Sequence, residues 1–326
     1  MYDADLPDDT RNSLLRAQRD GDVGAEDIGS VSKRYKQLDD AEADQLDGLI
    51  QRQGDDGMEF AAELDGDTLS DLLSCGSRTV GGAAVYATSA GAGVSQSSGC
   101  TLDTDFLDAV ADVNGKADDF DAQAFARRYN KLEGDNERRF RELAKNDDYG
   151  ESWMRAVDGE GIESSQIRAG LTRTSDVQEF GEVKEFSTGR QINSEEYPSD
   201  WEPVHKKDSI VTEYTLTEDI SFQRVYTSQG NKAAGRFLPR NRQDIDNLTP
   251  EQIQAKYAIP GDPPDRVAIA QIPKETTMRT GSAAPNNFGS GGGTQYTLPR
   301  SEVPPNQFNS NWFDESDDLT KKLNEN

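Results

Sequence analysis

The chain has 326 residues, a formal net charge of −26 at pH 7 and only 33% hydrophobic residues. An acidic surface of this strength repels phosphate backbones and anionic lipids, which argues against nucleic-acid and membrane-surface binding. Two cysteines and one histidine are too few for a four-ligand zinc site, and we expect no metal centre.

Two interpretations of the acidity compete. High charge with low hydrophobicity is typical of disordered chains, but it is also typical of folded proteins from a high-salt cytoplasm. The regular spacing of apolar residues favours the folded, high-salt protein. The first residues are acidic where a secretory signal would be basic, and no apolar run approaches the ~20 residues of a membrane span. We therefore expect no transmembrane segment and, if the protein leaves its cell, export by a specialised system.

The N-terminal half contains an internal repeat of helical character. The segment that begins at Val31 resembles the segment that begins at Phe125, with Tyr35 and Tyr129 matched at an offset of 94 residues. The other matched positions are Arg34 with Arg128, Leu38 with Leu132, Leu46 with Phe140, and Leu49 with Leu143. These positions are mostly apolar, as expected when a fold rather than a site is duplicated. The prediction is one unit at residues 1–75 and its repeat at residues 102–170.

The helical prediction comes from the apolar spacing. Leu46, Leu49 and Ile50 follow an i, i+3, i+4 pattern, and Gly54 is a predicted C-terminal stop. The paired Arg34 and Tyr35 suggest either a ligand site or an amphipathic helix edge. We favour the edge, with the tyrosine packed and the arginine solvated.

Two segments look irregular, one between the two helical units and one between the second unit and the C-terminal part. Residues 76–101 form a Gly/Ser-rich insert, which Cys75 and Cys100 flank as a possible disulfide or as two free thiols. Residues 171–209 read as a linker. The linker contains His205, in a polar stretch that predicts a solvent-exposed side chain.

Residues 210–326 form the β-rich part, which ends in an acidic tail. The expected strands are Ile210 to Tyr214, Phe222 to Tyr226, Val267 to Ile272, and Gln295 to Leu298. The most informative motif is Gly291-Gly292-Gly293 followed by Thr294, Gln295 and Tyr296. Glycines permit a backbone to approach a ligand closely, and a polar side chain directly after them can be aimed at it. The alternative is a flexible linker, because Gly/Ser runs usually are linkers.

The order of motifs between residues 206 and 315 resembles the C-terminal toxin domains of polymorphic toxin systems, in particular the NAD-glycohydrolase family of the tuberculosis necrotizing toxin. That family has an arginine on an early strand, a Gly-x-Phe/Tyr-Leu element, a proline-rich middle and a terminal Gly-Gly-Gly-Thr-Gln-Tyr motif. The matching elements here are Arg224, Gly235 to Leu238, Pro260 to Pro264, and Gly291 to Tyr296. The chain departs from the pattern at the second family arginine, for which Arg236, Arg240 and Arg242 compete.

The repeat and the β-rich part together predict an α+β protein: a duplicated, acidic all-α half followed by a small β-rich, mixed α/β domain, which the resemblance makes toxin-like. The resemblance implies NAD as the substrate, with no cofactor, and an immunity protein as the partner. The catalytic candidates are Gln295, for the ribose and the attacking water, and Arg224, for the diphosphate. The substrate-binding candidates are Phe237, Arg240, Arg242, Gly292, Gly293 and Thr294.

The expected reaction is hydrolysis of NAD to nicotinamide and ADP-ribose. The leaving group is a cationic pyridinium, so the bond breaks through an oxocarbenium-like transition state without a general acid. Two alternatives stay open. One is ADP-ribosyl transfer to protein, although transferases commonly place a glutamate where this chain has Gln295, and the nearest glutamate is Glu302. The other is a non-catalytic adaptor with acidic helical units that bind a partner.

Overall fold

The structure is a computed structural model that describes residues 11–12, 15–16, 24–74, 103–197, 202–229, 237–239, 244–300, 310–314 and 317–319. About 49% helix and 20% strand, with antiparallel sheets, confirm the mixed α+β class. The chain divides into two compact units, Met1–Glu133 and Gly134–Asn326. This division falls inside the predicted unit 102–170. The insert at residues 76–101 and both cysteines lie outside the described residues.

The described part of the first unit is helical. Its helices are α2 (Ala25–Tyr35), α3 (Asp40–Gln53), α4 (Asp55–Glu63), α5 (Gly66–Leu73), α6 (Thr104–Lys116) and α7 (Ala122–Tyr129). The predicted apolar face of α3 is buried, and Gly54 ends that helix with a positive φ of 58°. Tyr35 and Tyr129 are each only 7% exposed, so the prediction of packed tyrosines is confirmed. Arg34, predicted to be solvated, is instead half-buried, and its Nε donates to the Leu64 carbonyl at 2.6 Å.

Aspartates are the N-cap residues of four of these helices, so some of the acidic residues have a structural role. Asp39, Asp65, Asp103 and Asp121 each accept a hydrogen bond from the backbone N–H three residues further on. Such N-caps satisfy amide groups that the first helical turn leaves unpaired.

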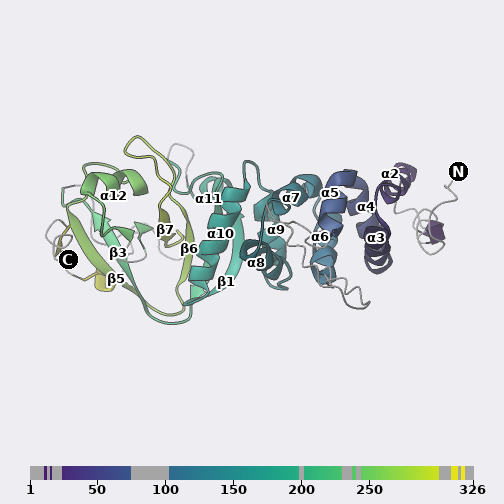
Figure 1. The fold of residues 1–326 in the computed structure, drawn as a ribbon. Coiled ribbons are helices and arrows are strands. Elements are labelled where there is room, and N and C mark those ends of the chain that lie inside the picture. The colour runs from purple at the N-terminus through teal and green to yellow at the C-terminus, as the bar shows by residue number, and fades with distance from the viewer. Residues whose placement is uncertain are drawn as a thin grey trace, which may run out of the picture. The chain divides into compact units, whose positions relative to one another are not determined.

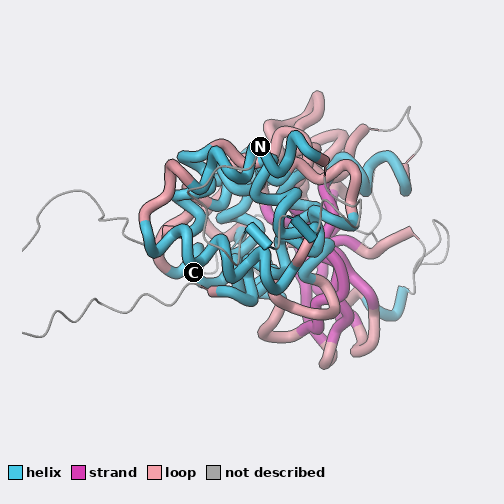
Figure 2. Tube along the Cα trace, turned by 90° about the vertical axis from the view of Figure 1, so that its right-hand side faces the viewer, coloured by secondary structure: helices cyan, strands magenta, loops and turns pink. Residues whose placement is uncertain are grey.

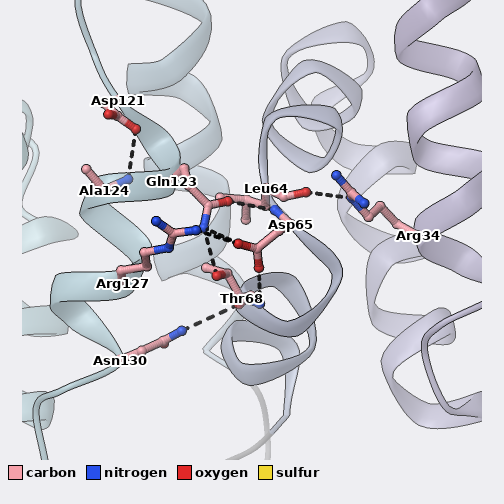
Figure 3. Close-up of polar contacts among 9 residues, drawn as sticks. All are labelled: Arg34, Leu64, Asp65, Thr68, Asp121, Gln123, Ala124, Arg127 and Asn130. Carbon is pink, nitrogen blue, oxygen red and sulfur yellow. Dashed lines mark hydrogen bonds and ion pairs between the residues drawn. The ribbon is translucent and has the colours of Figure 1, made fainter.

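One of these caps also joins two helices, as Figure 3 shows. Arg127 Nη2 lies 2.6 Å from Asp65 Oδ2, and Gln123 Nε2 donates to both Asp65 Oδ2 and Thr68 Oγ1. Hydrogen bonds from Thr68 and Arg127 lower the pKa of Asp65 to about 2. The start of α5 is thereby tied to α7.

The second unit combines helices with two antiparallel sheets. Its helices are α8 (Asp135–Ala144), α9 (Gly150–Asp158), α10 (Ser164–Val177), α11 (Gly189–Glu196) and α12 (Pro250–Tyr257). The larger sheet has the order β1 (Gly181–Thr188), β2 (Ile210–Leu216), β6 (Thr277–Ser282), β7 (Thr294–Thr297) and β4 (Phe237–Leu238). The smaller sheet has the order β3 (Ile220–Tyr226), β5 (Arg266–Ile272) and β8 (Asp317–Asp318). The strands, magenta in Figure 2, gather in one part of the molecule.

Helices α10 and α11 pack on opposite faces of the larger sheet. On one face, Thr174 of α10 lies 3.1 Å from Thr212 of β2, through their hydroxyl oxygens, and Figure 1 shows α10 alongside the sheet. On the other face, Ile192 of α11 packs in a cluster with Tyr197 and Val211. Neighbouring residues of a strand point to opposite faces, so Thr212 and Val211 define an α10 face and an α11 face.

Four aromatic side chains join the two sheets on the α10 face. Tyr296 of β7 packs against Phe222 of β3 at a ring-centroid distance of 5.2 Å, and Phe180 contacts Tyr214, Phe222 and Tyr296. All four are buried. Burial of such rings is a large apolar contribution to this core.

Several predictions for the second unit are tested by its elements. The four expected strands are present as β2, β3, β5 and β7, each within two residues of the expected bounds. The segment 171–209 is not a linker, because it contains the end of α10, β1 and α11. His205, expected at the surface, is only 1% exposed, because it lies between Gly281 of β6 and the α11 segment. The acidic tail contributes β8 and the buried Leu319.

Candidate functional site

The three motifs of the predicted site lie on neighbouring segments of the second unit. The backbone N–H of Gln223 in β3 donates to the carbonyl of Pro239, which directly follows β4 (3.1 Å). Strand β4 pairs with β7, with Phe237 opposite Thr297. The early arginine strand, the Phe-Leu element and the strand after the triple glycine are therefore adjacent in space.

Arg224 is a guanidinium without a carboxylate partner among the described residues. Its Nη1 donates to the backbone carbonyl of Phe237 at 3.0 Å, while its Nε has no hydrogen-bond partner in the part of the chain that the structure describes. The side chain shares a strand face with Phe222, which packs on Tyr296. Burial lowers the pKa of Arg224 to about 10, so the group remains positively charged at neutral pH.

Gln295 lies on the face of β7 opposite to that of Tyr296. It is 5% exposed, and its Nε2 donates to the backbone carbonyl of Val204 at 2.7 Å. Its neighbour Tyr296 points to the α10 face, so Gln295 points to the α11 face, where His205 lies. Phe237 is opposite Thr297 and therefore shares this α11 face. The structure thus places Gln295 and Phe237 on one face and Arg224 on the other, and it does not bring the two predicted catalytic side chains together.

Two of the three glycines are explained by contacts within the protein. A Cβ on Gly291 would lie 2.5 Å from the carbonyl oxygen of Ala283, and one on Gly293 would lie 2.8 Å from Tyr257 Cε1. The run crosses the last turn of α12, where Gly293 N–H donates to the Lys256 carbonyl. Gly292 alone has open space at its Cβ position. These glycines therefore allow the backbone to pack closely against other parts of the protein, mainly α12 and the residues that follow β6.

This explanation predicts different costs for two neighbouring substitutions. Gly291 and Gly292 both have a positive φ, 64° and 89°, so alanine is strained at either position. We expect Gly292→Ala to lower the free energy of unfolding by about 1 kcal/mol. Gly291→Ala is expected to cost at least about 1 kcal/mol more, because its Cβ meets backbone. Urea unfolding of both variants measures the difference. Equal costs would show that Gly291 is not required for this close approach.

The other predicted ligand residues have mixed positions. Thr294 is half-buried at the start of β7 and shares the α10 face with Tyr296. Arg240 and Arg242 lie outside the described residues, so their predicted phosphate contact stays a prediction.

Sequence reasoning missed a second unpaired guanidinium, that of Arg173 on α10. This side chain is 4% exposed and forms no ion pair with a carboxylate among the residues that the structure describes, although the charge of Asp176 favours its protonated form. It lies outside the segment 206–315, and an arginine within an amphipathic helix ordinarily reads as a solvated residue. No signal in the sequence distinguishes it.

Comparison with protein-family models, with curated proteins and with solved structures finds no match to this chain. Within the described ranges, no three His, Cys, Asp or Glu side chains form a group that could hold a metal ion. None of the described helices is both long enough and apolar enough to cross a membrane.

Proposed function

We propose that the C-terminal domain, residues 210–326, hydrolyses NAD to nicotinamide and ADP-ribose, with Arg224 binding the diphosphate. The observation that carries this proposal is the guanidinium of Arg224, which has no carboxylate partner among the described residues of a chain with 61 acidic residues. The side chain is half-buried, and a partly desolvated cation is stabilised when an anion pairs with it. A diphosphate fits this chemistry because guanidinium groups bind phosphate oxygens in a bidentate manner.

The reaction does not demand an acid or base from this chain. Nicotinamide leaves as a neutral molecule once the glycosidic bond breaks, so the protein has to hold the diphosphate and orient the ribose and water. Thr294 offers a hydroxyl on the same face as Tyr296, beside the aromatic core. We assign Gln295 a positioning role, because its amide donates to the backbone carbonyl of Val204 and does not face an open surface.

The test is nicotinamide release from NAD by the full-length protein in molar KCl. We expect Arg224→Met to lower kcat/KM by about 100-fold, as loss of a charged donor does in other active sites. Arg190→Met, a substitution of an exposed arginine in the same unit, should leave kcat/KM unchanged.

The outcomes separate the alternatives. A folded wild-type protein that releases no nicotinamide would overturn the proposal and leave the adaptor function. Release accompanied by labelled ADP-ribose on protein would assign the transferase reaction instead.

In this proposal the domain acts as a toxin that removes NAD from a target cell, and an immunity protein would protect the producing cell.

We also propose that the helical repeat is a true duplication. Helices α2 to α5 and α7 to α10 follow each other in the same order, and α4 and α9 begin 95 residues apart, at Asp55 and Gly150. Leu46 and the matched Phe140 are both fully buried. The duplicated helices would serve delivery or attachment rather than chemistry.

A further inference from the structure

Residues 204–206 run across the α11 face of the larger sheet and cover Gln295; we call them the strap. The Nε2 of Gln295 donates to the backbone carbonyl of Val204 at 2.7 Å, and Gln295 is only 5% exposed. Val204 also packs against the apolar cluster that α11 forms with β2. The amide of Gln295 is therefore bonded to the protein's own backbone as long as the strap is in place.

The strap belongs to no strand, and a side chain of α11 holds it. The Oδ1 of Asn193 accepts hydrogen bonds from the backbone N–H groups of Val204 and His205, and its Nδ2 donates to the carbonyl of His205. On the side of the sheet, the strap forms an isolated bridge between His205 and Ala283. Release of the strap therefore breaks none of the strand pairs of the larger sheet. Segments with so few bonds open at a lower free energy than the core does.

The imidazole of His205 is the buried end of the strap. It lies above Gly281 of β6, where a Cβ would be 2.7 Å from Nδ1, and Nδ1 has no hydrogen-bond partner among the described residues. Its Nε2 faces the hydroxyl of Thr297 of β7 at 3.5 Å. The neighbouring charged residues of the same segment, Lys206 and Asp208, pair with each other. Closing the strap thus places the ring in a site that leaves one of its nitrogens without a hydrogen bond.

The charges around this ring oppose its protonation. Arg279 of β6 and Arg173 of α10 both act on it with a positive charge. Glu213 of β2 and Glu196 of α11 lie on the same side of the sheet, but both pair with Arg279. A protonated imidazole in the closed strap would be a buried cation beside two other cations, which is unfavourable.

We infer that the strap is a proton-sensitive device, which closes over Gln295 at neutral pH and opens when His205 binds a proton. In the closed form the amide of Gln295 holds the carbonyl of Val204. In the open form this amide, and the α11 face around it, can meet a ligand. The opening is a property of the fold, so it does not depend on the proposed hydrolysis of NAD.

The size of the response follows from the difference between the two forms. Burial, together with the charges of Arg279 and Arg173, lowers the pKa of His205 to about 3 in the closed form. A released histidine has a pKa of about 6.5, so below this pH the open strap binds a proton that the closed strap does not. The ratio of open to closed strap should therefore rise about 30-fold from pH 8 to pH 5. We expect the closed form to remain the major one over this range.

Amide hydrogen exchange of the full-length protein at pH 8 and pH 5, corrected for the intrinsic exchange rates, measures the opening. The amide of Lys206 donates to the Ser282 carbonyl and that of Ala284 to the Val204 carbonyl, so both report on the strap. The paired strands β2 and β6 provide reference amides. We expect the strap amides to be less protected than the reference amides at both pH values, with an opening constant that is about 30-fold larger at pH 5.

Two variants separate the effect of the proton from that of the hydrogen bonds. His205→Gln should abolish the rise at pH 5, because glutamine does not titrate. Gln295→Ala removes one hydrogen bond to the strap. It should raise the opening constant about fivefold at both pH values and leave the ratio between them at about 30-fold.

Strap amides that are as protected as the reference amides would mean that residues 204–206 open only together with the whole unit, which overturns the inference. An opening constant that is the same at pH 8 and pH 5 overturns it as well. Both criteria apply to the wild type, so they decide the question even where His205→Gln does not fold. Nicotinamide release enters none of these measurements, so the proposed function stands or fails separately.

Discussion

Replacing Arg279 by methionine is expected to lower the free energy of unfolding of the second unit by about 3–5 kcal/mol. Arg279 of β6 lies between two carboxylates on the α11 face. Its Nε is 2.7 Å from Glu213 Oε2 of β2, and its Nη1 pairs with Glu196 Oε1 at the end of α11. The three side chains are only 13%, 26% and 14% exposed, in the order Arg279, Glu213, Glu196.

The size of this effect comes from what the substitution leaves behind. Methionine fills much of the space of the arginine, but two mostly buried carboxylates lose their common cation and repel each other. Urea unfolding, followed by tryptophan fluorescence, measures the loss. Trp153 is a suitable probe because it is fully buried in this unit against Phe186.

An exposed ion pair provides the control. Arg138 of α8 pairs with Glu142 and Asp135, but its side chain is 53% exposed. Arg138→Met should cost far less than Arg279→Met, because water and salt screen such pairs. If the two substitutions cost the same, burial does not determine the strength of the Arg279 network. Adding Glu213→Gln to the Arg279 variant should recover part of the lost stability.

The strands were predictable where apolar and polar residues alternate regularly, and were missed where they do not. In β1 the register shifts between Val183 and Glu185, so Lys184 and Glu185 are both exposed. The next buried residue is Phe186, one position later than strict alternation would place it. Strand β6 has the sequence TMRTGS, in which polar groups make hydrogen bonds or ion pairs to helices on both faces. Neither strand gives a period of two in hydrophobicity.

The sequence predicted which segments of the candidate site lie together, but not the face of the sheet on which each side chain lies. The motifs around Arg224, Phe237 and Gln295 indicated segments that do lie together, because β3, β4 and β7 are neighbours. The face of each side chain depends on which residue of β7 enters the aromatic core. Tyr296 enters it and Gln295, one residue away, therefore cannot. Arg173 and His205 were missed because their burial depends on contacts with residues distant in the sequence.

His205 is buried, and no described residue supplies a negative charge that would favour its protonated form. Its Nδ1 has no hydrogen-bond partner among the described residues, and its Nε2 lies 3.5 Å from Thr297 Oγ1. Gly281 makes room for the ring, because a Cβ there would lie 2.7 Å from Nδ1. Burial, together with the positive charges of Arg279 and Arg173, lowers the pKa of His205 to about 3. The imidazole is therefore neutral in the folded protein at all ordinary pH values.

This depressed pKa gives stability that is present above pH ~6.5, the value for an unfolded histidine, and is lost as the pH falls from there toward 3. Between these values the unfolded chain binds a proton that the folded chain does not. At pH 5 the expected loss is about 2 kcal/mol relative to pH 8. His205→Gln should remove this part of the pH dependence, while the contribution of the carboxylates stays the same in both proteins.

The chain has one histidine, so nuclear magnetic resonance can follow its imidazole without overlap. We expect the ring C–H shifts of the folded protein to stay constant from pH 8 to pH 5. A titration with a midpoint between pH 6 and 7 would mean that the ring reaches water in the folded state. In that case the wild type and His205→Gln would also lose stability in parallel on acidification, because a group with the same pKa in both states contributes nothing to the slope.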